Sequence, residues 1–206
     1  MVIENNLPKE WESIPLKDIV FFKKGKKPKR MAIEPFDGSV TYLDIKAIEM
    51  QVNEIFVDID SSKITDDSEL VLVWDGARAG WIGQSRYGAL GSTLMALKPL
   101  IDKLYLYRFI QTQFNYLQNN HRGTGIPHID PDILWNISVP IPPLSEQHRI
   151  VAKLDALFEK IESNKKHLEK IPQILKRFRR SVLAAAVSGK LTEDWRDTNN
   201  EVDDAE

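Results

Sequence analysis

Apolar residues in the last third of the chain recur at the alternating three- and four-residue spacing of a coiled-coil helix. The pattern holds for about five heptads and has one polar member, Asn164, a residue type that often fixes register. Ser145 as an N-cap and Gly189 as a stop delimit a predicted helix over residues 145–188, about 66 Å long at ~1.5 Å per residue. The predicted seam consists of Ile150, Leu154, Leu157, Ile161, Asn164, Leu168, Ile171, Leu175, Phe178 and Val182.

A helix of this length cannot pack along its whole length on a domain of about 140 residues. We therefore expect it to project and to pair its seam with a partner helix. Pro172 lies beside the seam and removes the hydrogen bond to the carbonyl of Leu168, which predicts a kink. The alternative is an ordinary last helix packed on a compact domain, although about five regular heptads exceed what such a helix shows.

Residues 1–143 contain short runs of β-type composition and one amphipathic helical stretch, a pattern that predicts a mixed α+β domain. Runs of β-type composition, separated by turns rich in Asp, Gly and Ser, occupy residues 40–45, 54–59, 70–74, 81–84, 93–97 and 137–141. An amphipathic helix is predicted over residues 101–119, with core-facing side chains at helical spacing: Leu106, Phe109, Ile110, Phe114 and Leu117. The predicted organisation is a domain at 1–143, a coiled-coil helix at 144–189 and a tail at 190–206.

Composition places this chain among soluble globular proteins, with 42% hydrophobic and 28% charged residues in 206 positions. The lack of Cys excludes disulfides and thiolate metal sites. No apolar run approaches the ~18 residues of a membrane span, and the N-terminus lacks the apolar core of a signal peptide. We therefore expect a cytoplasmic protein with no membrane partner.

The net charge of −2 conceals two local extremes. Residues 192–206 carry seven carboxylates against one Arg196, which predicts a disordered acidic tail. Six of the ten residues at 21–30 are basic. Such density beside aromatic residues suits contact with the phosphates of double-stranded DNA. The alternative for this segment is a solvated basic loop.

Candidate DNA contacts fall in three segments: residues 21–30, 74–87 and 121–128. Arg pairs with guanine and Gln with adenine in the major groove, and glycines allow close approach of the backbone. The alternatives are a tight hairpin with buried tryptophans for residues 74–87 and a Gly-rich connector for residues 121–128. Phosphate contacts are predicted for Lys23, Lys24, Lys26, Lys27, Lys29, Arg30 and Arg122, and base-edge contacts for Arg78, Gln84, Arg86 and Thr124.

Signatures of catalysis are largely missing from the sequence, which has no phosphate loop, dinucleotide fingerprint or nucleophile elbow. Asp37, Asp44 and Lys46 loosely match the two carboxylates and lysine of a Mg²⁺-dependent nuclease, which stays open as a rival function. A metal site is not expected, because the spacing of its candidate ligands fits no standard site: His121, His128, Asp130 and Asp132.

Three segments resemble those of type I restriction-modification specificity subunits. VPIPPLSEQHRIV at residues 139–151 is similar to the link between a recognition domain and a long shared helix, and RSVLAAAVSGKLT at residues 180–192 is similar to the end of that helix. LPKEW at residues 7–11 resembles the start of a recognition domain. The resemblance thus spans nearly the whole chain and is weak only between residues 24 and 120.

The resemblance implies a non-catalytic subunit that reads DNA. Members of this family have two recognition domains and two long helices, which pair antiparallel and set the gap between two half-sites. The helices dock methyltransferase subunits, with restriction subunits outside them, and those partners use S-adenosylmethionine, ATP and Mg²⁺, so no cofactor is expected on this chain. With one domain and one helix, the chain would need a second copy or second half as a partner. A coiled-coil adaptor that binds only protein is a further rival.

Overall fold

The computed structural model describes residues 7–123, 125 and 127–199, which divide between two units at residues 1–152 and 153–206. The first unit is mixed α+β and a long helix dominates the second, which confirms the predicted fold class. The division falls at 152 instead of 143, because Gln147 and Val151 in the first turns of the long helix are buried. Ser145 is not an N-cap, since the helix already begins at Leu144.

The strands are β1 (Glu12–Pro15), β2 (Val20–Lys24), β3 (Met31–Ala32), β4 (Ser39–Leu43), β5 (Phe56–Asp58), β6 (Ile64–Thr65), β7 (Leu70–Val73), β8 (Ile82–Gln84), β9 (Gly88–Leu90), β10 (Leu94–Pro99) and β11 (Ser138–Ile141). The helices are α1 (Ile45–Met50), α2 (Lys103–Asn119), α3 (Pro131–Trp135), α4 (Leu144–Val187) and α5 (Glu193–Thr198), with 3₁₀ turns η1 (Leu16–Asp18) and η2 (Lys190–Thr192).

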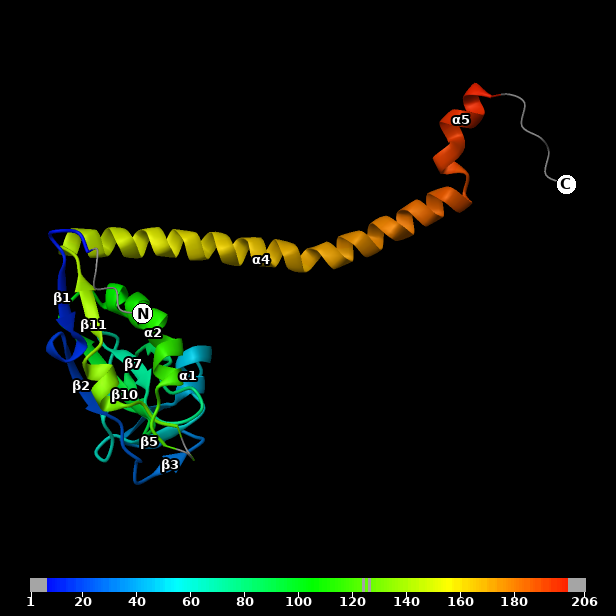
Figure 1. Cartoon of the computed structure of the whole chain (residues 1–206). Coiled ribbons are helices and arrows are strands. Elements are labelled where there is room, and N and C mark those ends of the chain that lie inside the picture. Colours follow the sequence, from blue (N-terminus) through cyan, green and yellow to red (C-terminus); the bar gives the residue numbers. More distant parts are fainter. Residues whose placement is uncertain (1–6, 124, 126, 200–206) are drawn as a thin grey trace. The chain divides into compact units, whose positions relative to one another are not determined.

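Three small sheets make up the first unit. The strand orders are β2-β10-β7-β8, β3-β5-β4-β9-β6 and β1-β11, and every pair is antiparallel except β4 with β9. In the pair β1-β11, Glu12 lies opposite Ile141 and Pro15 opposite Ser138. Figure 1 shows these two strands side by side, so the first and the last strand of the unit pair with each other.

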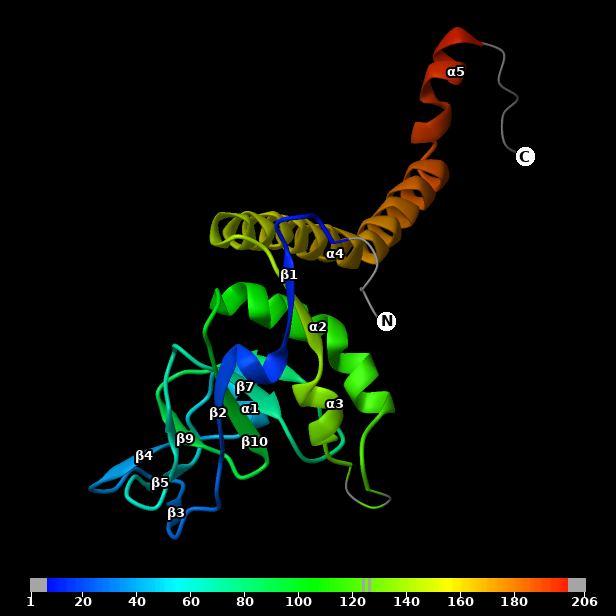
Figure 2. The ribbon, with the colours of Figure 1, turned by 60° about the vertical axis from the view of Figure 1, so that its left-hand side comes forward.

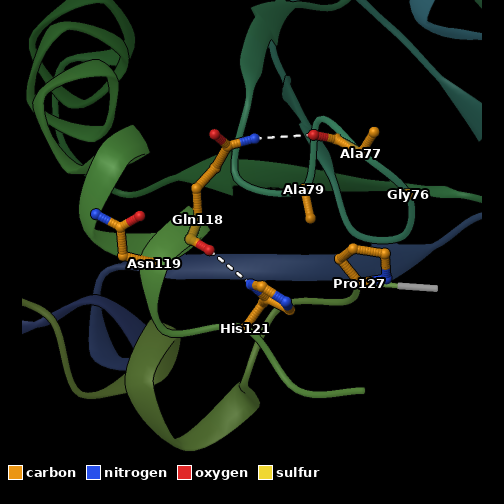
Figure 3. A pocket seen from close by; sticks show the side chains of 7 residues that line it. All are labelled: Gly76, Ala77, Ala79, Gln118, Asn119, His121 and Pro127. Atoms are coloured by element: carbon orange, nitrogen blue, oxygen red, sulfur yellow. Dashed lines mark hydrogen bonds between the residues drawn. The ribbon is translucent and has the colours of Figure 1, made fainter. Parts of the chain in front are cut away.

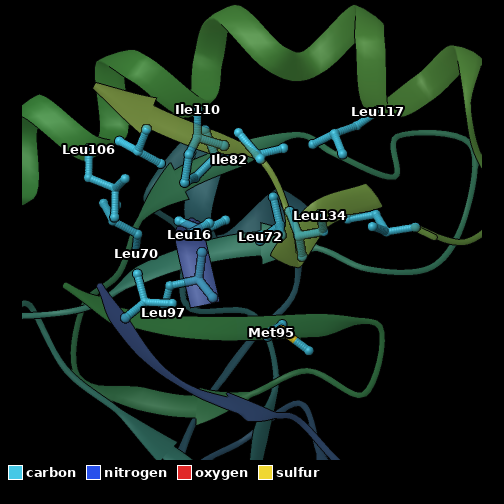
Figure 4. Close-up of a cluster of buried hydrophobic side chains, with 14 of the residues drawn as sticks. Leu16, Leu70, Leu72, Ile82, Met95, Leu97, Leu106, Ile110, Leu117 and Leu134 are labelled. Carbon is cyan, nitrogen blue, oxygen red and sulfur yellow. The ribbon is translucent and has the colours of Figure 1, made fainter. Parts of the chain in front are cut away.

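The main core lies between α2 and one face of the four-stranded sheet (Figure 4). Leu70 and Leu72 of β7 pack there with Leu106 and Ile110 of α2. The intervening Val71 and Val73 belong to a second cluster with α1, β4 and β9. Alternate residues of β7 thus pack into different clusters, and the strand is an uninterrupted apolar run because both of its faces are covered.

Most predicted elements are present with shifted ends, and several short elements were not predicted. The predicted strand at residues 40–45 overlaps β4, but Ile45 already belongs to α1. The N-cap of α1, Asp44, accepts a hydrogen bond from the Ala47 amide at 2.7 Å. In α2 the predicted Leu106, Ile110 and Leu117 are buried, while Phe109 and Phe114 are partly buried. The missed elements are α1, α3, α5, η1, η2, β1, β2, β3, β6 and β9, none longer than six residues.

The long helix α4 carries the predicted seam along an exposed face. Every seam side chain from Leu157 to Val182 is exposed, reaching 60% at Ile161 and 64% at Leu168, whereas Ile150 and Leu154 are partly buried. The ribbon changes direction in its orange stretch (Figure 2), which contains Pro172. The helix ends as predicted, before a left-handed glycine at position 189.

The described part of the acidic tail contains regular structure. Residues 190–198 form η2 and α5, so the predicted disorder does not hold for them, and residues 200–206 lie outside the described part of the chain. Within the described residues, no helix combines the length and apolar character needed to cross a bilayer.

Candidate nucleic-acid interface

The basic segment at residues 21–30 contains cations in quite different surroundings. Lys23 in β2 places Nζ 2.8 Å from Oε1 of Glu69, whose side chain is only 7% exposed. The other Glu69 oxygen accepts a hydrogen bond from the Thr65 hydroxyl at 2.6 Å, and Thr65 also contacts the Ser85 hydroxyl at 2.8 Å. A buried carboxylate needs such partners to remain charged. Lys23, predicted as a phosphate contact, therefore balances an internal charge.

Lys24 lies beside a group of aromatic side chains that the sequence analysis did not single out as a cluster. Its Nζ is 2.9 Å from Oδ2 of Asp75 and 5.6 Å from the centroid of the Trp74 ring. Trp135 of α3 is 4.3 Å from Phe22 and 6.4 Å from Trp74 between ring centroids. Phe22 is 55% exposed, so this cluster offers one aromatic face to solvent next to a paired lysine.

The loop that follows β2 presents unpaired cations on a fixed backbone. Lys26, Lys27 and Lys29 are exposed and make no ion pair with any residue that the structure describes. The Lys29 amide donates to Ser61 Oγ at 2.9 Å, and the Arg30 amide donates to Asp58 Oδ1 at 2.8 Å. These bonds hold the loop, so its three ammonium groups are exposed cations on an anchored backbone, and their contact with phosphate stays a prediction.

Arg30 and Asp58 complete this anchor. The Arg30 guanidinium lies 3.8 Å from the centroid of the Phe36 ring, a cation–π contact that leaves its charge intact. Hydrogen bonds from the Ser61 side chain first, and then from the Arg30 amide, lower the pKa of Asp58. The loop is therefore fastened by a carboxylate that stays ionised through the neutral range.

The two arginines predicted to read base edges are both hydrogen-bonded to other groups of the protein. Arg78 donates through Nη1 and Nη2 to the two Glu49 oxygens at 2.9 and 3.0 Å and stacks 4.9 Å from Trp81. The hydrogen bond to Glu49 is the main cause that raises the pKa of Arg78. Arg86 donates through Nη2 to the carbonyls of Ala47 and Val52 at 3.1 and 2.5 Å, at the two ends of the turn that closes α1.

Base reading by these arginines stays a prediction, and it requires each to exchange its present partners for a base. Gln84, at the end of β8, is exposed and makes no hydrogen bond through its side chain with any described residue. Thr124 lies outside the described residues. The four predicted base readers therefore comprise two engaged arginines, one unattached amide and one residue whose surroundings the structure does not describe.

Arg122 is neutralised by acidic neighbours in the segment after it. Its Nε is 2.5 Å from Asp130 Oδ2 and its Nη2 is 2.8 Å from Asp132 Oδ2. The hydrogen bond to Asp130 is the largest influence raising the pKa of Arg122. The backbone of Arg122 exchanges two hydrogen bonds with that of His128, at 2.9 and 3.1 Å. Arg122 therefore closes the base of its loop, with two carboxylates opposing attraction to phosphate.

The structure joins two segments that the sequence left separate, the loop after β7 and the loop after α2. The Gly76 amide donates to the Pro127 carbonyl at 2.8 Å, and the Ile129 amide donates to the Trp74 carbonyl at 3.1 Å. A hollow of about 190 Å³ opens beside this junction (Figure 3). Its lining combines backbone-rich small residues with polar side chains from the end of α2: Gly76, Ala77, Ala79, Gln118, Asn119, His121 and Pro127.

Several residues proposed for nuclease or metal chemistry have structural partners, among them Asp44, Lys46 and Asp130. Asp44 caps α1, and Lys46 Nζ lies 2.7 Å from Glu54 Oε1, while Asp37 lies in the turn before β4. Asp130 caps α3 by accepting from the Asp132 amide at 2.9 Å. Among the described residues, no three potential ligand side chains group around a possible metal position.

Comparison with known proteins accounts for this combination of a mixed unit and a long helix. The profile of the family described as "Type I restriction modification DNA specificity domain" matches residues 8–173. The chain belongs to this family. The match covers most of the β-rich specificity domain and the larger part of α4, so it confirms the resemblance found at residues 139–151.

Curated relatives of this specificity domain come from an archaeon and a bacterium. The type I restriction enzyme MjaVIII specificity subunit of Methanocaldococcus jannaschii is 30% identical over 92% of this chain and 48% of its own length. The EcoDI specificity subunit of Escherichia coli is 33% identical over 94% of this chain and 41% of its own length. The chain thus spans about half the length of these relatives.

A solved structure shares the fold of the specificity domain. The HsdS subunit from Thermoanaerobacter tengcongensis superposes with a TM-score of 0.71 at 21% identity, over 89% of this chain and 46% of that one. A likeness at this identity concerns the fold, which includes the long C-terminal helix.

The family motif at residues 139–151 contains an anchor that the sequence analysis did not assign. Gln147 is buried, its Oε1 accepts from the Asp102 amide at 3.1 Å, and its Nε2 donates to the Pro142 carbonyl at 2.8 Å. Trp11 Nε1 donates to Glu146 Oε2 at 3.3 Å. These bonds tie the first turn of α4 to both ends of the mixed unit, and they give Glu146 and Gln147 of the motif structural roles.

Proposed function

We propose that this chain is the non-catalytic DNA-reading module of a type I restriction-modification enzyme, and that it recognises one half of a bipartite target. The observation that carries the proposal is the family match over residues 8–173, which includes both the mixed unit and most of α4. The anchored loop with Lys26, Lys27 and Lys29 supplies the sequence-independent attraction to phosphate that such a reader needs.

In this proposal, α4 pairs with the same helix of a second copy or of a second half. The exposed seam supports pairing, because an apolar stripe of this length is costly to leave in water. Charge supports an antiparallel arrangement: residues 144–163 hold three Lys or Arg and four carboxylates, whereas residues 164–187 hold seven Lys or Arg and one carboxylate. Antiparallel helices place the basic half of each against the nearly neutral half of the other, whereas parallel helices would bring the two basic halves together.

The paired helices would act as a spacer between two reading units and as the docking platform for methyltransferase subunits, with restriction subunits bound through them. S-adenosylmethionine, ATP and Mg²⁺ would then belong to those partners. The relatives named as type I specificity subunits support this assignment.

The test is to express the chain with its methyltransferase subunit in cells that lack adenine methylation and to sequence the methylome. We expect one split motif, with two identical half-sites in inverted orientation if two copies pair antiparallel. Random methylation, or none with a demonstrably assembled complex, would contradict the proposed function.

The seam is tested by Ile161→Asp and Leu168→Asp, each of which puts a charge in the apolar stripe. Sedimentation of the purified chain is expected to show a dimer that either substitution dissociates. Ser163→Asp is the matched control, because position 163 is also exposed on α4 but lies outside the seam. If all three variants sediment as the unmodified chain does, the seam does not hold the assembly together.

A further inference from the structure

The hollow beside the junction of the two loops is small and partly polar. Its volume of about 190 Å³ is below the ~300–1,000 Å³ of pockets for drug-sized ligands, which argues against a whole nucleotide cofactor. It lies between the end of α2 and the loop after β7, two segments that are packed closely together. Gly80 has a φ of +92°, and a Cβ added there would lie 2.9 Å from the Leu117 Cβ.

One side chain of this hollow is held in a single orientation by the backbone opposite it. Gln118 Nε2 donates to the Ala77 carbonyl at 2.9 Å across the two segments (Figure 3). A carbonyl oxygen only accepts, so the amide nitrogen must be the atom that faces Ala77. The remaining N–H of the amide and its Oε1 make no hydrogen bond with a described residue. Gln118 thus presents one donor and one acceptor side by side.

A second polar group on the same helix end is fixed in a similar way. His121 Nδ1 is 2.6 Å from the Gln118 main-chain carbonyl, to which it must donate. In the neutral tautomer its Nε2 is then an acceptor. The hollow therefore offers two acceptors and one donor from side chains whose positions are set by bonds to the backbone.

We propose that Gln118 is a specificity-determining residue that reads an adenine through its N6 and N7 edge in the major groove. The Oε1 atom accepts from the N6 amino group, and the free N–H donates to N7, the bidentate pattern by which Gln selects adenine. The inference rests on the proposed function, and it adds a residue outside the eleven DNA contacts predicted from sequence.

Preorganisation favours Gln118 over the amide predicted from sequence. Gln84 is exposed without a hydrogen bond through its side chain, so binding a base would immobilise it at an entropic cost. Gln118 has already lost that freedom through its bond to Ala77. Arg78 and Arg86 are preorganised too, but Nη1 and Nη2 of Arg78 face Glu49, and Nη2 of Arg86 faces backbone carbonyls while its Nε is buried.

The experiment selects binding sites from randomised DNA with the chain in complex with its methyltransferase subunit. Gln118→Ala is expected to keep the motif except at one A·T pair, where preference for adenine falls about 5- to 150-fold. Gln118→Arg is expected to shift that position toward guanine, because Arg pairs with guanine O6 and N7. Gln113→Ala is the matched control, since Gln113 is an amide on α2 that bonds to its neighbour Thr112.

A probe of the unmodified complex keeps the test valid even if a variant folds poorly. Replacing adenine at the affected position by 7-deazaadenine removes N7 and is expected to weaken binding by the unmodified complex at least fivefold and by Gln118→Ala by less than twofold. If the unmodified complex selects a motif and both Gln118 variants retain it unchanged, or lose affinity equally for all sequences, the inference is wrong while the proposed function stands. If the unmodified complex selects no motif, the proposed function fails and this inference fails with it.

Discussion

Lys23 and Lys26 lie three residues apart in one basic segment, yet their surroundings predict opposite responses to the same substitution. Lys23 Nζ is 2.8 Å from Glu69, whose side chain is 7% exposed. Lys26 is exposed and makes no ion pair within the described chain. Lys23→Ala should therefore affect the free energy of unfolding, and Lys26→Ala should affect the attraction to DNA.

The structure sets the size of each effect. Removing one member of a buried ion pair costs ~3–5 kcal/mol, because it leaves an uncompensated charge. The Lys23 side chain is 37% exposed, so water screens part of the pair and we expect a smaller loss, ~2 kcal/mol. Lys26→Ala should change stability by less than ~0.5 kcal/mol. It should lower the slope of log K against log salt by about 0.9, the value for one lost phosphate contact.

Urea unfolding measures the first effect, and fluorescence anisotropy with labelled DNA at several salt concentrations measures the second, with the methyltransferase subunit present. Adding Glu69→Gln to Lys23→Ala removes the uncompensated charge and should recover part of the lost stability. If Lys23→Ala lowers the salt slope by about one and leaves the urea midpoint unchanged, Lys23 contacts phosphate, and the stabilising role given to its ion pair with Glu69 is wrong.

Three further substitutions test the local geometry. Gly80→Ala should destabilise the chain by more than ~1 kcal/mol, because the positive φ and a 2.9 Å approach to a leucine Cβ leave no room for a side chain; an unchanged Tm contradicts this. Asp102→Ala should cost ~1 kcal/mol, since Asp102 caps α2 by accepting from the Tyr105 amide at 2.8 Å, and a constant urea midpoint would show that the cap is dispensable. The pKa of Asp58 is lowered, chiefly by the Ser61 side chain, below its unfolded value of ~3.9. Its stabilisation should be complete above about pH 4 and be lost as pH falls through the folded pKa, so the midpoint difference from Asp58→Asn should close on acidification and not on alkalinisation.

The parts of the fold that sequence predicted are those where one period repeats. The seam of α4 spans about five heptads, and α2 has four turns of apolar residues, so both were found with ends shifted by one or two residues. Short elements offer no such repetition. The Asp44 cap is a recognisable helix start, but the preceding strand was extended over it, and α1 was lost.

The chemical environment of the candidate contacts could not be predicted, because it depends on residues distant in sequence. Lys23 meets Glu69 and Arg78 meets Glu49, at separations of 46 and 29 positions. Residue type therefore indicated which side chains suit DNA but not which of them were already engaged. Gln118 was not predicted, because its proposed role depends on the hydrogen bond that fixes its side chain to the Ala77 carbonyl, 41 positions earlier in the sequence.

The pairing of β1 with β11 bears on how such a chain can change over time. The chain between Pro15 and Ser138 begins and ends at one antiparallel pair of strands. Trp11 and Gln147, whose side chains hold the first turn of α4, lie outside that stretch. A different polypeptide inserted between the same two strands would keep the contacts of α4 with Trp11 and Pro142, and would have to replace those that Asp102 makes with Gln147 and His148. Under the proposed function, exchange of the stretch between these two strands would change the target preference, while the Trp11 and Pro142 contacts of α4 would be kept.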